Sequence, residues 1–113
     1  MSDLHLKKCA PCEGGIAKLD GQSVGILLAK IPGWKLVAEG TAIERTFNFE
    51  NYWQTMAFVN AAAFVAHTED HHPDLSVHYN RCVVRYNTHA VGGLTDNDFI
   101  CAAKVNVLID GVE

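Results

Sequence analysis

The stretch EDHHPDLSVHYN, residues 69–80, changes from the period of a helix to the period of a strand. A residue that precedes proline is disfavoured in the helical region, so the helix that enters this stretch must end near Asp70, ahead of His72 and Pro73. Beyond the proline, apolar and polar residues alternate with the period of two that a half-buried strand shows. The alternating apolar residues are Leu75, Val77 and Tyr79. The stretch therefore predicts a junction between a helix and a strand.

Upstream of this junction the sequence predicts a long helix. Asn51 can cap its first turn, because an asparagine side chain accepts a hydrogen bond from a free N–H group there. Apolar residues recur at spacings of three and four, which predicts one buried face. This predicted face consists of Tyr52, Met56, Val59, Ala63 and Ala66, with Phe58 and Val65 outside it.

Further elements flank the long helix on both sides. Val24, Leu27, Leu28 and Ile31 predict a short helix before Pro32-Gly33, and a hairpin is predicted around Glu39-Gly40. The hairpin's alternating residues are Trp34, Leu36 and Ala38 on one side of the turn and Ile43, Phe47 and Phe49 on the other. Downstream, a second hairpin ends with Cys82, Val84 and Tyr86, and Thr95 with Asp98 has the spacing of a capping box that opens a last helix.

The predicted order of elements is α-β-β-α-β-β-α, which indicates an α+β fold. Two hairpins can join into one four-stranded antiparallel sheet with helices packed on one face. With 113 residues the chain is long enough for one core. We therefore predict an irregular N-terminal lead-in over residues 1–20 and a single domain over residues 21–113.

Composition limits the classes of partner. Acidic residues outnumber basic ones, and the net charge of −4 argues against binding to nucleic acid or to an anionic membrane. No segment is apolar enough to span a bilayer, and the start MSDLHLKKC lacks the apolar stretch of a signal peptide. We expect a cytoplasmic protein with no nucleic acid or membrane partner.

The cysteines of such a protein are expected to be reduced. Cys9 and Cys12 have the spacing of half a zinc knuckle, but the sequence has no second pair of this kind. Cys82 and Cys101 fall within predicted secondary structure. Our interpretation is a flexible N-terminal arm that carries spare thiols, with a metal or redox role for Cys9 and Cys12 as the alternative.

Three histidines are candidates for proton transfer. His71 and His72 lie at the end of the long helix, where free carbonyl groups and Asp70 favour the imidazolium form. His89 lies on a loop, where functional groups are common. Two other interpretations stay open: the histidines only cap the helix end, or His67, His71 and His89 bind a metal, although the HExxH pattern is absent.

An ordered set of residues resembles the pterin-4a-carbinolamine dehydratase family, in its bacterial form. The set runs through His71-His72-Pro73, Tyr79, Thr88-His89, Gly93-Leu94-Thr95 and Asp98, and the resemblance extends from Trp34 to about Ile109. Four residues before His71 many members carry an acid, whereas this chain has His67. This departure puts an assisting role at that position in doubt.

The resemblance implies a four-stranded antiparallel sheet backed by helices and a hydro-lyase activity. The implied reaction is the loss of water from a 4a-hydroxytetrahydropterin to give the quinonoid dihydropterin, without a cofactor or metal. It would belong to tetrahydropterin recycling, with a functional link to phenylalanine hydroxylase. One group must protonate the leaving oxygen and another must take a proton from ring nitrogen 5. We expect His71 and His89 to exchange these protons and His72 to bind and orient the ring.

The resemblance also implies further pterin-binding residues. We expect Pro73, Thr88, Ala90 and Val91 to line the substrate pocket. Asp98 is either a hydrogen-bonding group of the pocket or only part of the helix cap. Trp34 either covers the ring or packs in the core of the first hairpin, because tryptophan serves both purposes.

Two other functions compete with catalysis: a dimerisation or coactivator module, and a pterin-related role in molybdenum cofactor metabolism. The last helix also predicts self-association into a dimer or tetramer, because it is apolar nearly all round and would expose a large patch in a monomer. Its apolar residues are Phe99, Ile100, Cys101, Ala102, Ala103, Val105, Val107, Leu108 and Ile109.

Overall fold

The computed structural model describes residues 3–11 and 16–111, and these form one α+β layer structure. The helices and strands follow the predicted order α-β-β-α-β-β-α, with short 3-10 helices between them. The helices are α1 (Gly21–Leu28), α2 (Tyr52–Glu69) and α3 (Asp96–Asp110), the strands are β1 (Lys35–Val37), β2 (Ala42–Asn48), β3 (Asp74–His78) and β4 (Arg81–Tyr86), and the 3-10 helices are η1 (Leu4–Leu6), η3 (Ala38–Gly40) and η4 (His89–Val91).

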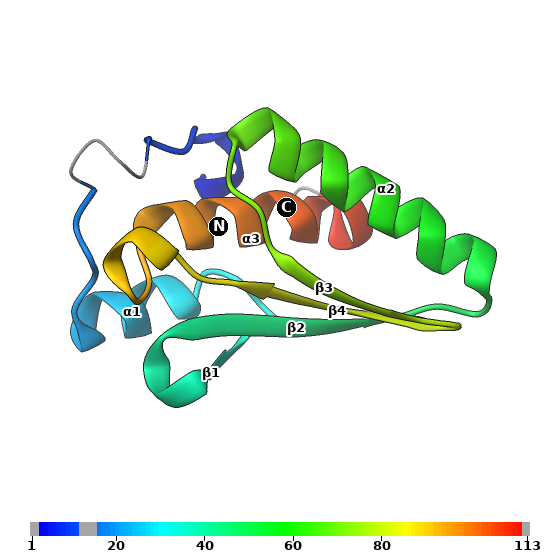
Figure 1. Cartoon of the computed structure of the whole chain (residues 1–113), viewed down its shortest axis with the longest axis horizontal. Coiled ribbons are helices and arrows are strands. Elements are labelled where there is room, and N and C mark those ends of the chain that lie inside the picture. Colours follow the sequence, from blue (N-terminus) through cyan, green and yellow to red (C-terminus); the bar gives the residue numbers. More distant parts are fainter. Residues whose placement is uncertain (1–2, 12–15, 112–113) are drawn as a thin grey trace.

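The four strands form one antiparallel sheet in the order β1-β2-β4-β3. The two hairpins join along β2 and β4, with Ile43 opposite Tyr86 and Asn48 opposite Arg81. Helices α2 and α3 lie across one face of this sheet (Figure 1). Strand β4 therefore lies in the middle of the sheet, and the buried side chains of Cys82, Val84 and Tyr86 pack beneath the helices.

The junction between α2 and β3 lies where the sequence predicts it. Helix α2 ends at Glu69, and Asp70 takes the left-handed conformation with φ 51° and ψ 43°. The backbone N–H of His71 then donates to the carbonyl of Ala66 at 3.1 Å. This closed helix end turns His71 inward before Pro73 starts the extended chain.

The buried face of α2 differs from the prediction. Thr55, Phe58, Ala62 and Ala66 are its buried residues, whereas Tyr52 and Ala63 are exposed. The Phe58 ring packs against the rings of Phe47 and Phe49, with centroid distances of 4.6 and 5.3 Å. An aromatic ring buries far more apolar area than an alanine. The face of α2 that carries Phe58 therefore packs on the sheet, in place of the predicted face.

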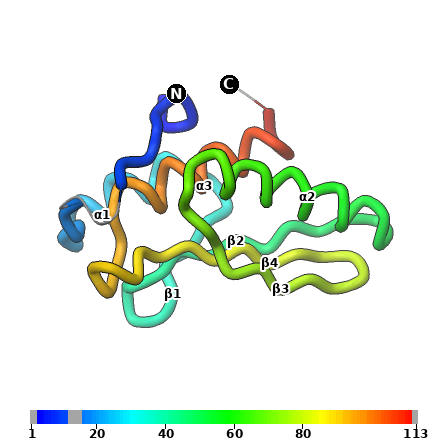
Figure 2. The backbone as a smooth tube through the Cα atoms, turned by 45° about the horizontal axis from the view of Figure 1, so that its top comes forward, coloured from blue at the N-terminus to red at the C-terminus, as the bar shows by residue number. Residues whose placement is uncertain are grey.

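The N-terminal segment covers α3 on the side away from the sheet (Figure 2). Leu4 of η1 is buried in the core, and Cys9 contacts Cys101. The expectation of a flexible arm with spare thiols is therefore wrong for Cys9, while Cys12 lies outside the described residues. Because its own chain covers α3, residues 99–103 and Val105 are buried in one copy. The predicted exposed patch on α3 is therefore limited in a monomer to the end of the helix, where Leu108 and Ile109 stay exposed.

Within the described residues, none of the helices combines the length and the apolar character that a membrane span requires.

Candidate active site

The centre of the candidate site is a buried pair formed by His71 and Asp98. The Nε2 atom of His71 lies 2.6 Å from the Oδ1 atom of Asp98. His71 is 5% exposed and Asp98 is 0% exposed. The end of α2 supplies the histidine and the first turn of α3 supplies the carboxylate, although 27 residues separate them in the chain. A close polar pair of this kind in a dry environment is a strong electrostatic interaction.

The second oxygen of Asp98 belongs to the cap of α3. Its Oδ2 atom accepts hydrogen bonds from the Thr88 hydroxyl at 2.8 Å and from the Thr95 backbone N–H at 3.0 Å. The hydroxyl oxygens of Thr88 and Thr95 are themselves 2.9 Å apart. Asp98 is thus both part of the capping box and the partner of His71, so the interpretation that it only closes the helix cap is too narrow. Its role in a substrate pocket stays a prediction. The network fixes the carboxylate in one orientation.

Tyr86 lies against the ring of His71 and was not among the predicted site residues. The two rings stack with a centroid distance of 5.5 Å and an angle of 9° between their planes. Burial and the neighbouring Cys101 thiol raise the pKa of Tyr86, which keeps the phenol neutral. In the sequence Tyr86 is only the last member of an alternating strand, so no local signal indicates this contact.

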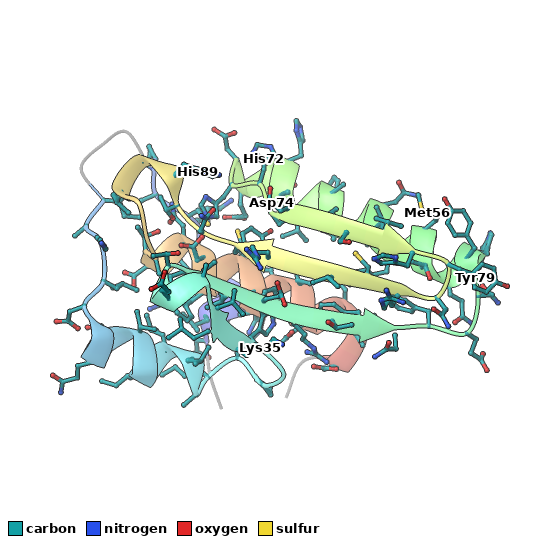
Figure 3. All side chains as sticks on the ribbon, turned by 60° about the horizontal axis from the view of Figure 1, so that its bottom comes forward. Lys35, Met56, His72, Asp74, Tyr79 and His89 are labelled. Atoms are coloured by element: carbon teal, nitrogen blue, oxygen red, sulfur yellow. The ribbon has the colours of Figure 1, made fainter. Side chains whose placement is uncertain are left out.

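His72 and His89 lie on the outside of the buried pair. His71 and Thr88 both contact the carboxylate of Asp98. His72 follows His71 and His89 follows Thr88 in the chain, so both lie at the same end of the sheet. Figure 3 shows both at this end, far from Met56 and Tyr79. His72 and His89 are both exposed. The structure therefore brings all three predicted histidines to one region, with one ring buried and two accessible.

The other expected pocket residues divide into two groups. Pro73 and Val91 are half-buried and Ala90 is exposed, next to His72 and His89 in the chain, whereas Thr88 is buried. Trp34 instead belongs to the core: it is 6% exposed, and its indole N–H donates to Asn106 Oδ1 at 2.8 Å. Tyr86 contacts both Trp34 and His71, with ring centroids 6.2 and 5.5 Å away. The burial of Trp34 favours the alternative that it packs in the core, and the covering of a bound ring stays a prediction.

The histidines proposed as metal ligands do not assemble. His67 is exposed on α2, and the Nε2 atom of His71 is occupied by Asp98. In the part of the chain that the structure describes, no group of three or more His, Cys, Asp or Glu side chains is arranged to hold a metal ion.

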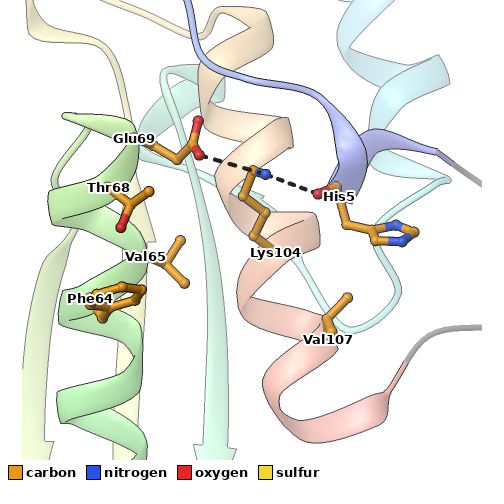
Figure 4. Close-up of a pocket in the computed structure, with 7 residues that line it drawn as sticks. All are labelled: His5, Phe64, Val65, Thr68, Glu69, Lys104 and Val107. Carbon is orange, nitrogen blue, oxygen red and sulfur yellow. Dashed lines mark hydrogen bonds and ion pairs between the residues drawn. The ribbon is translucent and has the colours of Figure 1, made fainter.

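A separate pocket of about 260 Å³ lies between α2, α3 and η1 (Figure 4). Its wall is mainly apolar, and Lys104 bridges Glu69 of α2 and the backbone carbonyl of His5. The lining residues are His5, Phe64, Val65, Thr68, Glu69, Lys104 and Val107. None of the three site histidines lines it.

The geometry at the histidines suits acid–base chemistry. A buried carboxylate in contact with an imidazole stabilises the imidazolium that forms when the ring accepts a proton, and it fixes the orientation of the ring. Two accessible imidazoles beside it can donate, accept or bind polar atoms of a substrate.

Comparison with known proteins agrees with this geometry. Residues 17–108 match the family model described as pterin 4 alpha carbinolamine dehydratase. Two bacterial relatives assigned to this activity, from Nitrosospira multiformis and Xanthomonas campestris pv. campestris, are 51% and 59% identical. The first alignment covers 96% of this chain and 94% of the relative, and the second covers 95% and 91%.

Two solved structures have a similar fold. One is a transcriptional coactivator/pterin dehydratase from Brucella melitensis, with 33% identity and a TM-score of 0.78, covering 81% of this chain and 98% of that one. The other is a pterin dehydratase-like RuBisCO assembly factor of the alpha-carboxysome, with 21% identity and a TM-score of 0.62, covering 71% and 93%, which shows the fold alone. From the match over most of its length, together with the histidines and the fold, this chain belongs to the pterin-4a-carbinolamine dehydratase family of hydro-lyases.

Proposed function

We propose that the site removes water from a 4a-hydroxytetrahydropterin and releases the quinonoid dihydropterin. The observation that carries this proposal is the buried His71–Asp98 pair at the same end of the sheet as the exposed His72 and His89. In the reaction the bond between C4a and its hydroxyl oxygen breaks, N5 loses its proton, and a double bond forms between C4a and N5. The hydroxyl group leaves as water after it gains a proton.

The histidines divide this proton transfer between them. His71 and His89 act as the acid–base pair at the reacting edge of the ring, and His72 binds and orients the ring. Asp98 stabilises the imidazolium of His71 at the stage when that ring carries the proton. Asp98 is a positioning residue. Its carboxylate is fully buried, so it acts on the reaction only by orienting His71. Pro73, Ala90 and Val91 supply the surface beside these histidines.

Turnover of a chemically prepared carbinolamine tests the proposal. We expect His71→Ala and His89→Ala each to lower kcat about 10²-fold or more, because each change removes a proton-transfer group. His78→Ala is the matched control, since His78 is an exposed histidine of β3 whose Nε2 atom contacts only Ser76 among the described residues. Wild-type turnover in either His71→Ala or His89→Ala would contradict the assignment of that histidine to proton transfer.

His72→Ala separates binding from chemistry. We expect KM to rise and kcat to change little, because the variant keeps both proton-transfer histidines and loses a group that holds the ring. A fall in kcat as large as that of His71→Ala, without a rise in KM, would assign His72 to the chemical step instead.

We further propose that the reaction belongs to tetrahydropterin recycling. A 4a-hydroxytetrahydropterin is the oxidised form that a pterin-dependent hydroxylase of aromatic amino acids leaves behind. A reductase for quinonoid dihydropterin would consume the product. A deletion strain that fails to grow on phenylalanine, and recovers with the wild-type gene but not with His71→Ala, would support this context.

The second candidate function is self-association or partner binding through α2. Trp53 and Phe64 are 79% and 70% exposed, and a spacing of eleven residues places them on one stripe of the helix, about three turns apart. Exposed aromatic residues on a stripe are typical of interaction surfaces. We propose that this stripe, Trp53 and Phe64, forms a contact between copies of the chain, independently of the histidine site.

A further inference from the structure

Two cysteines from opposite ends of the chain meet behind the candidate site. The Sγ atoms of Cys9 and Cys101 are 3.5 Å apart, although 92 residues separate them in the sequence. Both are free thiols, Cys9 half-buried and Cys101 fully buried. This contact joins the N-terminal segment to α3.

The backbone around Cys9 is fixed by three hydrogen bonds. The N–H of Cys9 donates to Glu69 Oε1 at 2.9 Å. The N–H of Ala10 donates to Asn97 Oδ1 at 2.9 Å, and the Asn97 amide donates back to the Ala10 carbonyl at 2.7 Å. The contact between the two sulfurs is therefore set by bonds to α2 and α3 on both sides of Cys9.

We propose that Cys9 and Cys101 form an oxidisable pair, which closes to an intramolecular disulfide in the presence of a hydroperoxide. A disulfide bond is about 2 Å long, so the sulfurs must approach by roughly 1.5 Å. A half-buried, non-helical segment can make this movement more easily than a helix in the core. The bond would fasten the N-terminal segment to α3.

The reaction balances without another reactant. The Cys9 thiolate attacks the terminal peroxide oxygen, the O–O bond breaks, and Cys9 becomes a sulfenic acid. The alkoxide of the hydroperoxide, or hydroxide in the case of hydrogen peroxide, leaves and takes up a proton. The Cys101 sulfur then attacks the Cys9 sulfur, the S–O bond breaks, and the proton of Cys101 leaves with the hydroxyl group as water. Two thiols are oxidised to one disulfide, and one hydroperoxide is reduced to water and an alcohol, or to two waters when it is hydrogen peroxide.

The surroundings make this a slow reaction. The hydrogen bond with Cys101, then burial and the nearby Glu69, raise the pKa of the Cys9 thiol, so little thiolate is present near neutral pH. The Tyr86 phenol adjoins Cys101, and burial keeps this phenol neutral, so it supplies no base for the thiols. The pair is therefore suited to prolonged oxidation rather than to rapid removal of peroxide.

The disulfide would also hold the end of α2 in place. Glu69, which accepts from Cys9, lies two residues before His71, and the N–H of His71 closes the helix on Ala66. Fastening Cys9 therefore restrains the helix end that positions His71. We expect amide hydrogen exchange of residues 66–71 to slow after oxidation.

Peptide mapping of the full chain tests the proposal. The reduced protein is incubated with hydrogen peroxide, the remaining thiols are alkylated, and the digest is analysed by mass spectrometry. We expect a cross-linked peptide that contains Cys9 and Cys101. Cys12→Ser should keep this cross-link, and Cys9→Ser should lose it. Because Cys9 is only half-buried, the Cys9→Ser variant is expected to fold even if a change at the buried Cys101 does not.

Several results would overturn the inference. A Cys9–Cys12 disulfide, a disulfide between two chains, or fully reduced thiols in folded protein after prolonged oxidation would each do so. An unchanged exchange rate at residues 66–71 in protein that carries the mapped cross-link would overturn the link to the helix end. These measurements need no substrate, so their outcome is independent of the dehydration proposed above.

Discussion

Asp98 shows how one side chain connects fold and site. One of its oxygens caps α3 through Thr95 and the other contacts His71, so the same carboxylate starts a helix and orients an imidazole. The negative charge matters to the histidine, whereas an uncharged amide could still accept one hydrogen bond at the cap. The two roles can therefore be separated by a substitution that keeps the shape and removes the charge.

Asp98→Asn is expected to lower kcat by about 10²-fold, because the imidazolium of His71 loses its carboxylate partner. KM should change little, since the buried carboxylate acts on the substrate only by positioning His71. Asp96→Asn is the matched control, because Asp96 is an exposed carboxylate in the same turn of α3. A wild-type kcat in Asp98→Asn would show that the carboxylate serves the cap alone.

A second prediction at the level of residues concerns metals. Full turnover is expected after exhaustive chelation, since dehydration here needs an acid and a base and no metal ligand set is required. Elemental analysis of the purified protein, before and after chelation, measures this together with the activity. One tightly bound metal per chain, whose removal abolishes turnover, would restore the interpretation of His67, His71 and His89 as ligands.

At the level of elements, the C-terminal end of α2 joins the N-terminal segment to the site. Glu69 accepts the Cys9 N–H and lies 3.6 Å from the Lys104 ammonium group. Burial by itself raises the pKa of the Glu69 carboxyl, but the Cys9 N–H and the charges of Lys104 and Lys8 lower it by more, so the net shift is downward. The ionised carboxylate therefore stabilises the folded chain.

This shift predicts how stability depends on pH. A carboxyl group whose pKa is lower in the folded chain stabilises the fold above its unfolded pKa of about 4.3, and this contribution is lost as the pH falls through the folded value. Unfolding in urea should therefore show a smaller free energy for Glu69→Gln than for wild type at pH 7. The difference should shrink in acid. The exposed Glu39 gives the control Glu39→Gln, and a difference that stays constant down to acid pH would contradict the role of the charge.

At the level of the whole molecule, α3 is covered on two sides, by the sheet on one and by the N-terminal segment on the other (Figure 2). Most of this apolar helix is therefore covered within one chain, and of its apolar residues only Leu108 and Ile109 at its C-terminal end stay exposed, at 40% and 46%. Trp53 and Phe64 on α2 are far more exposed. The stripe of Trp53 and Phe64 on α2 faces away from the core residues Phe58 and Ala62. Association between copies is thus expected at α2 rather than at α3.

Light scattering tests this expectation. Wild type is expected to have the mass of a dimer or tetramer at micromolar concentration, and Trp53→Glu combined with Phe64→Glu should reduce it to a monomer, because charged side chains cannot be buried without partners. Ile26→Glu introduces the same charge at an exposed apolar residue of α1 and should leave the mass unchanged. A wild-type monomer at this concentration would refute the association.

The sequence by itself determined the order of elements, the end of α2 near Asp70, the capping box of α3 and the candidate histidines. Each of these depends on neighbours within a few positions: a proline that forbids helix before it, a side chain that reaches an N–H three residues on, or an alternating strand period. Such short-range effects act in the same way wherever the segment lies in the fold.

Only the tertiary structure decided which strands join the hairpins, which face of α2 is buried, and what covers α3. It also placed Tyr86 against His71 and Cys9 against Cys101. Periodicity indicates that a segment has an apolar side, but it does not indicate which other element packs against that side. The apolar area that Phe58 buries against the sheet is larger than that of several alanines, so Phe58 decides which face of α2 is buried. The N-terminal segment has no apolar periodicity, so the sequence does not reveal its contact with α3. These contacts depend on the total apolar area that the whole chain buries when it folds. A short window of the sequence carries no information about that total.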